Sequence, residues 1–267
     1  MKIERITFYI HIYIKIILQD LKSKISYRSD FIISVIGMLC TNIVGFVSFW
    51  ILFCNFSTIA GWSYYEMLFL YGFSLIAITP VQCFFDNNWN LRTNVYSGDF
   101  IKYCFRPINL FFYYQSEIFD FKGIGQFIFG VFILIYSWIK FGISCNLIIV
   151  LQVLIGLISA SLVMISLQNV AAAACFWIQN SSYFMELVLK LRDYARYPIN
   201  IYNSVFKFLF TFIIPIAFIS YYPSLFVLRP DSIPLLSWLS PIISCILFFL
   251  SYKFWMFGAL KYNGTGS

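Results

Sequence analysis

The stretch Phe141–Leu189 reads FGISCNLIIVLQVLIGLISASLVMISLQNVAAAACFWIQNSSYFMELVL, and Glu186 is its one charged residue. A single helix over this block would be roughly 70 Å long, against about 30 Å for the hydrocarbon core of a bilayer. We therefore expect two membrane helices here. The turn is predicted at Gln168 and Asn169, and the run Ala171–Ala174 opens the second helix.

The composition of the whole chain leads to the same class of protein. Of 267 residues, 61% are hydrophobic, 22% aromatic and only 11% charged, whereas a soluble domain carries about 25% charged residues. The apolar excess must face lipid, since the alternative is a very large exposed apolar patch. We predict an all-α polytopic membrane protein with one integral membrane domain over residues 1–267. The net charge of +7 sits at the ends of apolar runs, which indicates membrane topology and not a nucleic-acid partner.

Six of seven apolar stretches are expected to cross the membrane. The stretches are about Phe31–Cys54, Tyr64–Phe85, Phe121–Ile139, two within Phe141–Leu189, Val205–Leu228 and Leu235–Trp255. Lys and Arg concentrate in residues 1–30, in the loop 86–120 and at Lys253 and Lys261, so these parts should be cytoplasmic. With both ends inside, the number of crossings must be even.

The stretch Val205–Leu228 is the one expected not to cross. It contains Lys207 and several prolines, which break helices, and irregular backbone at membrane depth needs cover from protein. We predict a re-entrant segment on the outer face within residues 190–230, marked by Pro198, Pro215 and Pro223. This places Lys190, Arg192 and Arg196 outside, against the positive-inside trend. The alternative makes Val205–Leu228 a span and the Ala-rich block one long helix.

Residues 1–30 predict a basic amphipathic helix at the cytoplasmic interface and not a signal peptide. The apolar positions that recur at helical spacing are Ile3, Ile6, Ile10, Ile14, Ile17, Leu21 and Ile25. The lysines lie largely off this stripe, as expected for a helix that lies in the headgroup region.

No catalytic, cofactor-binding or metal site is predicted. The sequence has no P-loop, no H-E-x-x-H and no G-x-S-x-G, and its single histidine, His11, lies on the amphipathic helix. Its seven cysteines form no C-x-x-C pair, and most lie inside apolar runs, so they read as small core residues.

Two functional classes would fit a membrane protein that works without an energy-supplying partner. An ion-coupled secondary transporter usually keeps ionisable residues near the bilayer midplane, and the clear spans here are nearly free of them. Glu186 and Lys190 are spaced as a helix-end ion pair. A membrane scaffold or assembly protein without transport activity is the other alternative. The missing charges favour a membrane domain whose energy source lies in a partner.

The loop 86–120 is the only sizeable internal cytoplasmic segment. Its apolar residues alternate with charged ones, and Gly98 and Pro107 divide it into short pieces. This pattern predicts a short amphipathic helix that docks on a partner, with Phe100 or Phe105 as an apolar knob. Arg106 would make bidentate bonds to a carboxylate. An ordinary solvated loop is the other reading.

The run RTNVYSGDFIKYCFRPIN, residues 92–109, resembles the cytoplasmic motif of type-2 ABC transporter permeases, in which a glycine precedes a hydrophobic stretch ending in Arg-Pro-Leu-Asn. The runs Arg196–Tyr202 and Ile214–Pro223 and the ending Tyr262–Ser267 are also similar to that family. The resemblance extends from about Tyr27 to the C-terminus. Cys104 and Phe105 stand where leucines are more usual.

The resemblance implies six transmembrane helices with an N-terminal amphipathic interfacial helix and a re-entrant segment before the last helix. It also implies that the protein is a non-enzymatic permease subunit in the cell membrane, with two separate ABC ATPase subunits that bind ATP and Mg. A second permease, identical or paralogous, would complete an exporter in the bacterial plasma membrane. The resemblance does not identify the substrate. The aromatic content of 22% would suit a hydrophobic or amphipathic substrate, but it suits lipid-facing helices equally well. The residues implied in ATPase coupling are Gly98, Phe100, Phe105, Arg106 and Pro107.

Overall fold

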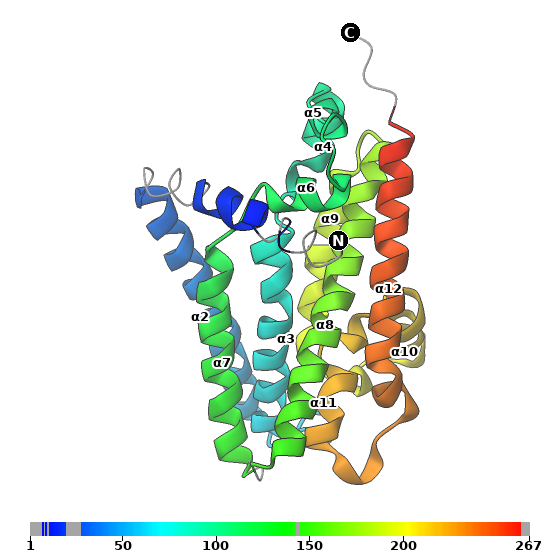
Figure 1. Cartoon of the computed structure of the whole chain (residues 1–267). Helices are drawn as coiled ribbons and strands as arrows, with labels where there is room; N and C mark the ends of the chain where they lie inside the picture. The colour runs from blue at the N-terminus through cyan, green and yellow to red at the C-terminus, as the bar shows by residue number, and fades with distance from the viewer. Residues whose placement is uncertain (1–6, 8, 10, 20–27, 143–144, 263–267) are drawn as a thin grey trace.

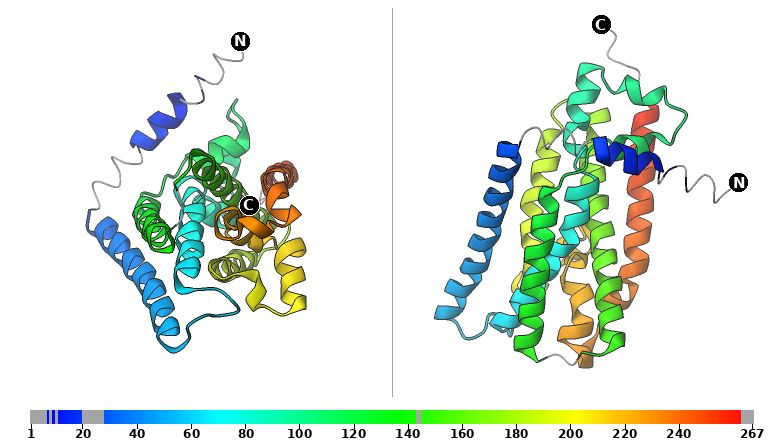
Figure 2. Two further views of the ribbon diagram at one scale, coloured as in Figure 1. Left: turned by 90° about the horizontal axis from the view of Figure 1, so that it is seen from below. Right: turned by 60° about the vertical axis from the view of Figure 1, so that its left-hand side comes forward.

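The computed structural model describes residues 7, 9, 11–19, 28–142 and 145–262, and all regular elements within them are helices. Five are long and apolar enough to cross a membrane. They are α2 (Arg28–Asn55), α3 (Tyr64–Phe84), α7 (Lys122–Phe141), α8 (Leu147–Ala173) and α12 (Leu235–Leu260). They run side by side, with α2 on the outer side of the bundle (Figures 1 and 2). The predicted all-helical, multi-pass architecture is confirmed.

The two ends of the bundle differ in what they carry. One end, here the loop end, holds the segment 86–120, the N-terminal helical residues and the end of α12 (top of Figure 1). The opposite end, here the far end, holds the turns 56–63 and 229–234. Helices α2, α3, α7 and α8 alternate in direction between these ends, whereas α12 runs from the far end to the loop end, as α8 does (Figure 1).

Helix α3 is the centre of the bundle and packs most closely on α7. Its residues Met67–Phe73 are all buried, although an isolated membrane helix would expose most of its surface to lipid. The close approach depends on glycine: a Cβ atom on Gly72 would lie 2.8 Å from the backbone nitrogen of Leu134. A Cβ atom on Gly130 would lie 3.0 Å from side-chain atoms of Leu75 and Ile76. Small residues at such crossings let membrane helices gain van der Waals contact.

The predicted turn at Gln168 and Asn169 is wrong. Both residues are buried inside α8, and Asn88 Nδ2 donates a hydrogen bond of 2.9 Å to Asn169 Oδ1. Because a neighbouring segment donates to the buried side-chain oxygen, this oxygen does not need water and the helix can continue through the polar pair. The chain turns at residues 177–181, between the short helix η1 (Ala174–Phe176) and α9 (Ser182–Arg192). This break also excludes one long helix over the Ala-rich block.

The segment between α9 and α12 is irregular. It consists of η2 (Asp193–Arg196), η3 (Ile199–Ile201), α10 (Ser204–Phe208), the π-helical turn η4 (Leu209–Ile213), η5 (Ile216–Phe218), α11 (Tyr221–Leu228) and η6 (Pro230–Ser232). Val205–Leu228 is therefore not a continuous helix. Pro198 and Pro215 immediately precede η3 and η5. Pro223 stands in the first turn of α11, where a backbone N–H has no intrahelical partner to lose.

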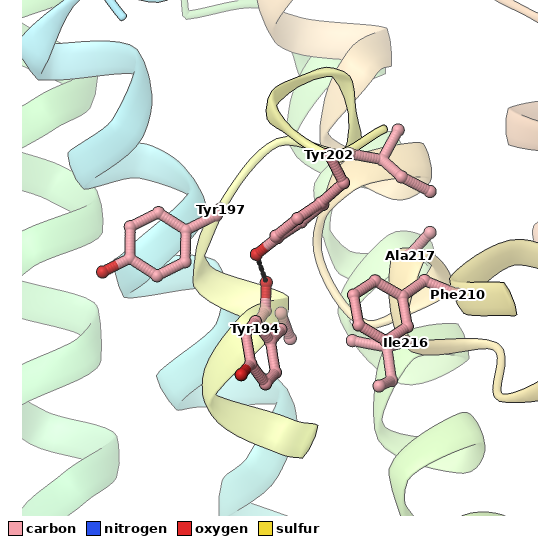
Figure 3. A pocket seen from close by; sticks show the side chains of 8 residues that line it. Tyr194, Tyr197, Tyr202, Phe210, Ile216 and Ala217 are labelled. Carbon is pink, nitrogen blue, oxygen red and sulfur yellow. Dashed lines mark hydrogen bonds between the residues drawn. The ribbon is translucent and has the colours of Figure 1, made fainter. Parts of the chain in front are cut away.

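The ends of this irregular segment meet. Ser220 Oγ donates a hydrogen bond to the backbone carbonyl of Ala195, so the chain returns to the level at which it left. Helix α9 comes down to this point from the loop end, and α11 leads from it to the far end (Figure 1). Tyr202 Oη points at the backbone carbonyl of Tyr194, 3.4 Å away, and its ring centroid lies 5.3 Å from that of Phe210 (Figure 3). Only about 10 Å³ stays empty among these rings, so the segment is packed and offers no room for a ligand.

The described part of the N-terminal region is helical and lies across the loop end (Figures 1 and 2). The ring centroids of Tyr9 and Phe112 are 4.8 Å apart in an edge-to-face arrangement. Of the predicted apolar stripe, Ile14 is exposed and Ile17 is half-buried, and the other members fall outside the described residues. Leu18, which is not part of the stripe, is also exposed.

A partly buried ion pair holds the far end together. Arg229 Nη1 donates to Glu66 Oε1, and Arg229 Nη2 donates to the carbonyl of Gly61 at 3.2 Å. The guanidinium also lies 4.7 Å from the ring centroid of Trp62. Glu66 caps the start of α3 together with Ser63, so one carboxylate joins the helix start to both turns of this end.

Candidate functional site

The loop 86–120 folds into three short helices: α4 (Asn88–Ser97), α5 (Ile101–Cys104) and α6 (Leu110–Ser116). Gly98 ends α4 with φ 85° and ψ −7°, in the left-handed region where a Cβ atom is strained. The chain reverses there and enters α5. Asn109 starts α6, and its Oδ1 accepts a hydrogen bond of 2.9 Å from the backbone nitrogen of Phe112.

A cluster of aromatic rings, here the aromatic cluster, anchors this loop to the bundle. Its members are Phe100, Tyr103, Phe111, Tyr114, Phe176, Trp255 and Tyr262. The ring of Phe100 lies 5.3 Å from that of Phe176 in η1, directly after α8, and 6.0 Å from that of Trp255 in α12. The cluster therefore connects the loop to the ends of two long helices.

Buried polar contacts reinforce the anchor. Gln115 Nε2 donates to Asn88 Oδ1 at 2.7 Å, which links α6 to α4, and Asn88 in turn reaches α8 as described above. Tyr103 Oη donates to Glu117. Burial, and then the bond to Glu117, raise the pKa of the Tyr103 phenol above its usual range, so it stays protonated at neutral pH. Arg92 Nε donates to the carbonyl of Gln179 at 2.7 Å and fixes α4 to the α8–α9 turn.

The opposite side of the loop faces outward and is here called the contact face. Its residues are Tyr96, Ile101, Phe105, Arg106 and Pro107, all exposed. Phe105 is 78% exposed. A phenylalanine ring is usually buried, or covered by lipid or by a protein partner. Arg106 makes no ion pair among the described residues and lies 6.0 Å from the ring centroid of Tyr113.

The structure separates the predicted coupling residues into two groups. Phe105, Arg106 and Pro107 lie together on the contact face. Phe100 is fully buried in the aromatic cluster, so Phe105 alone can serve as an apolar knob. Gly98 shapes the turn that brings α5 to the surface.

A second polar group was not anticipated from the sequence. Arg192 and Arg196 were predicted outside, yet both line a small cavity with Asn42 of α2 and Tyr71 of α3. Two signals were available in the sequence. The two arginines are four residues apart, and Asn42 is a lone asparagine in the apolar run 31–54. A larger cavity, about 1040 Å³ on α3, α7 and α8, is lined by apolar and small polar residues and by no charged residue.

The described residues contain no group of three or more His, Cys, Asp or Glu side chains that could hold a metal ion. The chain therefore combines a bundle of apolar helices with a rigidly anchored contact face at one end. These features define a multi-pass membrane domain with an exposed contact face.

A comparison of the sequence with protein families identifies the family of this membrane protein. The sequence model of the ABC-2 family transporter proteins matches residues 11–266, so the chain belongs to this family. It is a membrane-spanning permease of an ABC transporter, and permeases of this family work with ABC ATPase subunits. Neither the curated proteins nor the solved structures contain a match to this chain.

Proposed function

We propose that this chain is the permease of an ATP-driven exporter of hydrophobic or amphipathic molecules, with its loop end in the cytoplasm. The observation that carries the proposal is the contact face, where an exposed phenylalanine and an unpaired arginine stand on a rigid anchor. This chain has no P-loop. ATP and Mg therefore bind to two ATPase subunits, which hydrolyse the nucleotide. A second permease, identical or paralogous, completes the pathway.

Charge supports the orientation in the bacterial plasma membrane. Among the described residues, the loop end carries Lys15, Arg92, Lys102, Arg106, Lys122, Lys253 and Lys261, whereas the far end carries Lys140 and Arg229. Such an excess of Lys and Arg is typical of the cytoplasmic side. Both termini are then cytoplasmic, and the N-terminal helix lies in the interface.

The even number of crossings is reached by a broken sixth span. Helix α9 runs inward from the cytoplasmic side, and α11 completes the passage. Residues 193–219 form an irregular segment between these two half-helices, in place of the re-entrant segment predicted to enter from the outer face. The hydrogen bond from Ser220 to Ala195 supports this reading, because it aligns the two half-helices. The packed rings of Figure 3 supply the protein cover that irregular backbone needs inside a membrane.

Cysteine labelling tests the orientation. In a background without the seven native cysteines, Ser57→Cys is expected to react with a membrane-impermeant maleimide on intact cells, because Ser57 is exposed at the far end. Ser97→Cys, exposed at the loop end, should react only after permeabilisation. The cysteine-free parent reports background labelling. Reaction of Ser97→Cys in intact cells would overturn the orientation.

Arg106→Lys tests the coupling role of the contact face. Lysine keeps the charge but loses the planar fork that binds a carboxylate in two places. Loss of a charge-assisted hydrogen bond should weaken association with the ATPase subunit by about tenfold or more, measured by co-purification and ATPase activity in proteoliposomes. Phe105→Ala should act in the same direction.

Lys140→Arg is the matched control, since it is another charge-preserving exchange at an exposed position but at the far end. It should leave ATPase association within about twofold of the parent, because surface substitutions away from special features have small effects. Wild-type association of both contact-face variants would refute the coupling role. Transport driven by an ion gradient without ATP would favour a secondary carrier, and no transport with any energy source would favour a scaffold.

A further inference from the structure

A polar cavity of about 70 Å³ lies between α2, α3, α7 and the end of α9. Its polar lining comprises Thr41, Asn42, Tyr71, Ser74, Gln126, Arg192, Asp193 and Arg196. A water molecule occupies about 30 Å³ in the liquid, so the space suits a few waters or one compact chemical group. We call it the arginine cavity.

The arginine cavity lies inside the span of the bundle. Arg192 is ten residues beyond the start of α9 at the loop end, which corresponds to roughly 15 Å, about half of a 30 Å hydrocarbon core. Charged side chains at this depth are costly, so they mark functional sites unless they are neutralised by a partner.

The positive charge of the cavity is only half neutralised. Arg196 Nη2 pairs with Asp193 Oδ1 at 2.7 Å, and Arg196 Nε donates to the Asp193 carbonyl at 2.9 Å. Within the described part of the chain, Arg192 has neither an ion-pair partner nor a hydrogen bond, and the cavity is lined by no carboxylate besides Asp193. One guanidinium is therefore left for a ligand.

A second, independent observation concerns Asn42. Its side chain is only 7% exposed, lines the cavity, and its Nδ2 finds no hydrogen-bond partner in the structure described. A buried unpaired donor costs free energy. The hydroxyl of Tyr71 donates to the backbone carbonyl of Asn42 at 2.8 Å, which holds this turn of α2 against α3. Gly45 permits this approach, since a Cβ atom there would lie 2.5 Å from Tyr71 Oη.

We propose that the arginine cavity binds the anionic headgroup, a phosphate or a carboxylate, of an amphiphile. Arg192 supplies the charge and a planar fork that matches either group, and Asn42 supplies a further donor. The apolar tail leaves the cavity past Leu75 and Ile78, the apolar residues of its lining. This deepens the proposed function by naming its substrate class, and it rests on that function only for the role of the amphiphile as cargo.

Dodecyl phosphate and dodecanoate are the probes, applied to the purified permease in nanodiscs of neutral lipid. Saturable binding is expected for both by isothermal titration, and inorganic phosphate should bind at least about tenfold more weakly because it lacks the buried tail. Equal binding of inorganic phosphate would overturn the proposal, since the tail would then contribute nothing.

Four variants assign the binding to the cavity. Arg192→Gln should weaken dodecyl phosphate binding by about tenfold or more, because a charge-assisted bond is lost, and Asn42→Leu should weaken it in the same direction. Asp193→Asn should strengthen binding, because it releases Arg196, and a misfolded protein could not give that result. Lys190→Gln is the control: it removes an equal charge from an exposed position on the same helix and should leave the affinity unchanged.

Unchanged affinity in both Arg192→Gln and Asp193→Asn would refute the arginine cavity as the site. The binding assay needs no ATPase subunit, so its failure leaves the proposed transporter function standing. Conversely, binding with the expected variant pattern, but without stimulation of ATPase activity in the assembled complex, would retain the site and contradict the proposed cargo.

Discussion

Trp255→Ala is expected to lower the free energy of unfolding by about 3–5 kcal/mol, the range for truncating a large buried aromatic side chain. Trp255 is fully buried, and its ring contacts those of Phe100, Phe111 and Phe176 at centroid distances of 6.0, 5.2 and 5.7 Å. Its removal opens a cavity at the point where α12, the end of α8 and the loop 86–120 meet. The thermal unfolding midpoint of the purified protein, followed by circular dichroism, measures the change.

Trp238→Ala is the matched control on the same helix. Trp238 is 58% exposed and has one aromatic partner, Phe226, at 4.8 Å, so its loss should cost no more than about 1.5 kcal/mol. Trp255→Phe should be better tolerated than Trp255→Ala, because the ring is kept and Trp255 Nε1 has no hydrogen-bond partner in the described structure. Equal destabilisation by the two alanine variants would contradict the role assigned to the aromatic cluster.

The same variant separates anchoring from contact. Trp255→Ala leaves every residue of the contact face in place but removes the ring that connects the loop to α12. If the aromatic cluster transmits motion, ATPase subunits should still associate with this variant, while transport per ATP hydrolysed falls. Arg106→Lys should instead reduce association itself. The two variants therefore report on different steps of one coupling pathway.

The long helices could be predicted from the sequence. Lipid offers no hydrogen-bond partner, so the backbone N–H and C=O groups of an apolar segment must bond to each other in a helix. The apolar run Phe31–Cys54 corresponds to α2 and Tyr64–Phe85 to α3, within a few residues. The continuation of the helix through Gln168 could not be predicted, since the group that donates to Asn169 Oδ1 is Asn88, far away in the sequence. A polar pair inside an apolar run signals a turn only when no tertiary partner is available.

The candidate site was predictable in place but not in detail. Composition and charge located it in the loop 86–120, yet the alternation of apolar and charged residues could not show that Phe100 faces inward and Phe105 outward. Gly98 reverses the chain directly before Phe100, so no helical period carries across that point. The depth of Arg192 was missed for a related reason: moving the turn from Gln168 to residues 177–181 shifts every later residue along the membrane normal.

Gly72→Ala is the second variant with a large expected effect, because it acts on the closest helix crossing in the bundle. The new Cβ atom would lie 2.8 Å from the backbone nitrogen and 3.1 Å from the Cα atom of Leu134. Backbone atoms of α7 cannot rotate away as a side chain can, so α3 and α7 must separate. Overpacking of this kind costs about 1–3 kcal/mol, and Gly72→Val should cost more.

Gly37→Ala is the control for the helix propensity of alanine. Gly37 lies within α2, and a Cβ atom there would have no neighbour within 4 Å. The exchange should be neutral or stabilise the protein by about 0.5–1 kcal/mol, as expected for glycine to alanine inside a helix. Thermal unfolding of both variants in the same detergent therefore isolates the packing contribution. If Gly72→Ala unfolds at the same temperature as Gly37→Ala, α3 and α7 do not pack through Gly72, and the central position of α3 in the bundle would have to be revised.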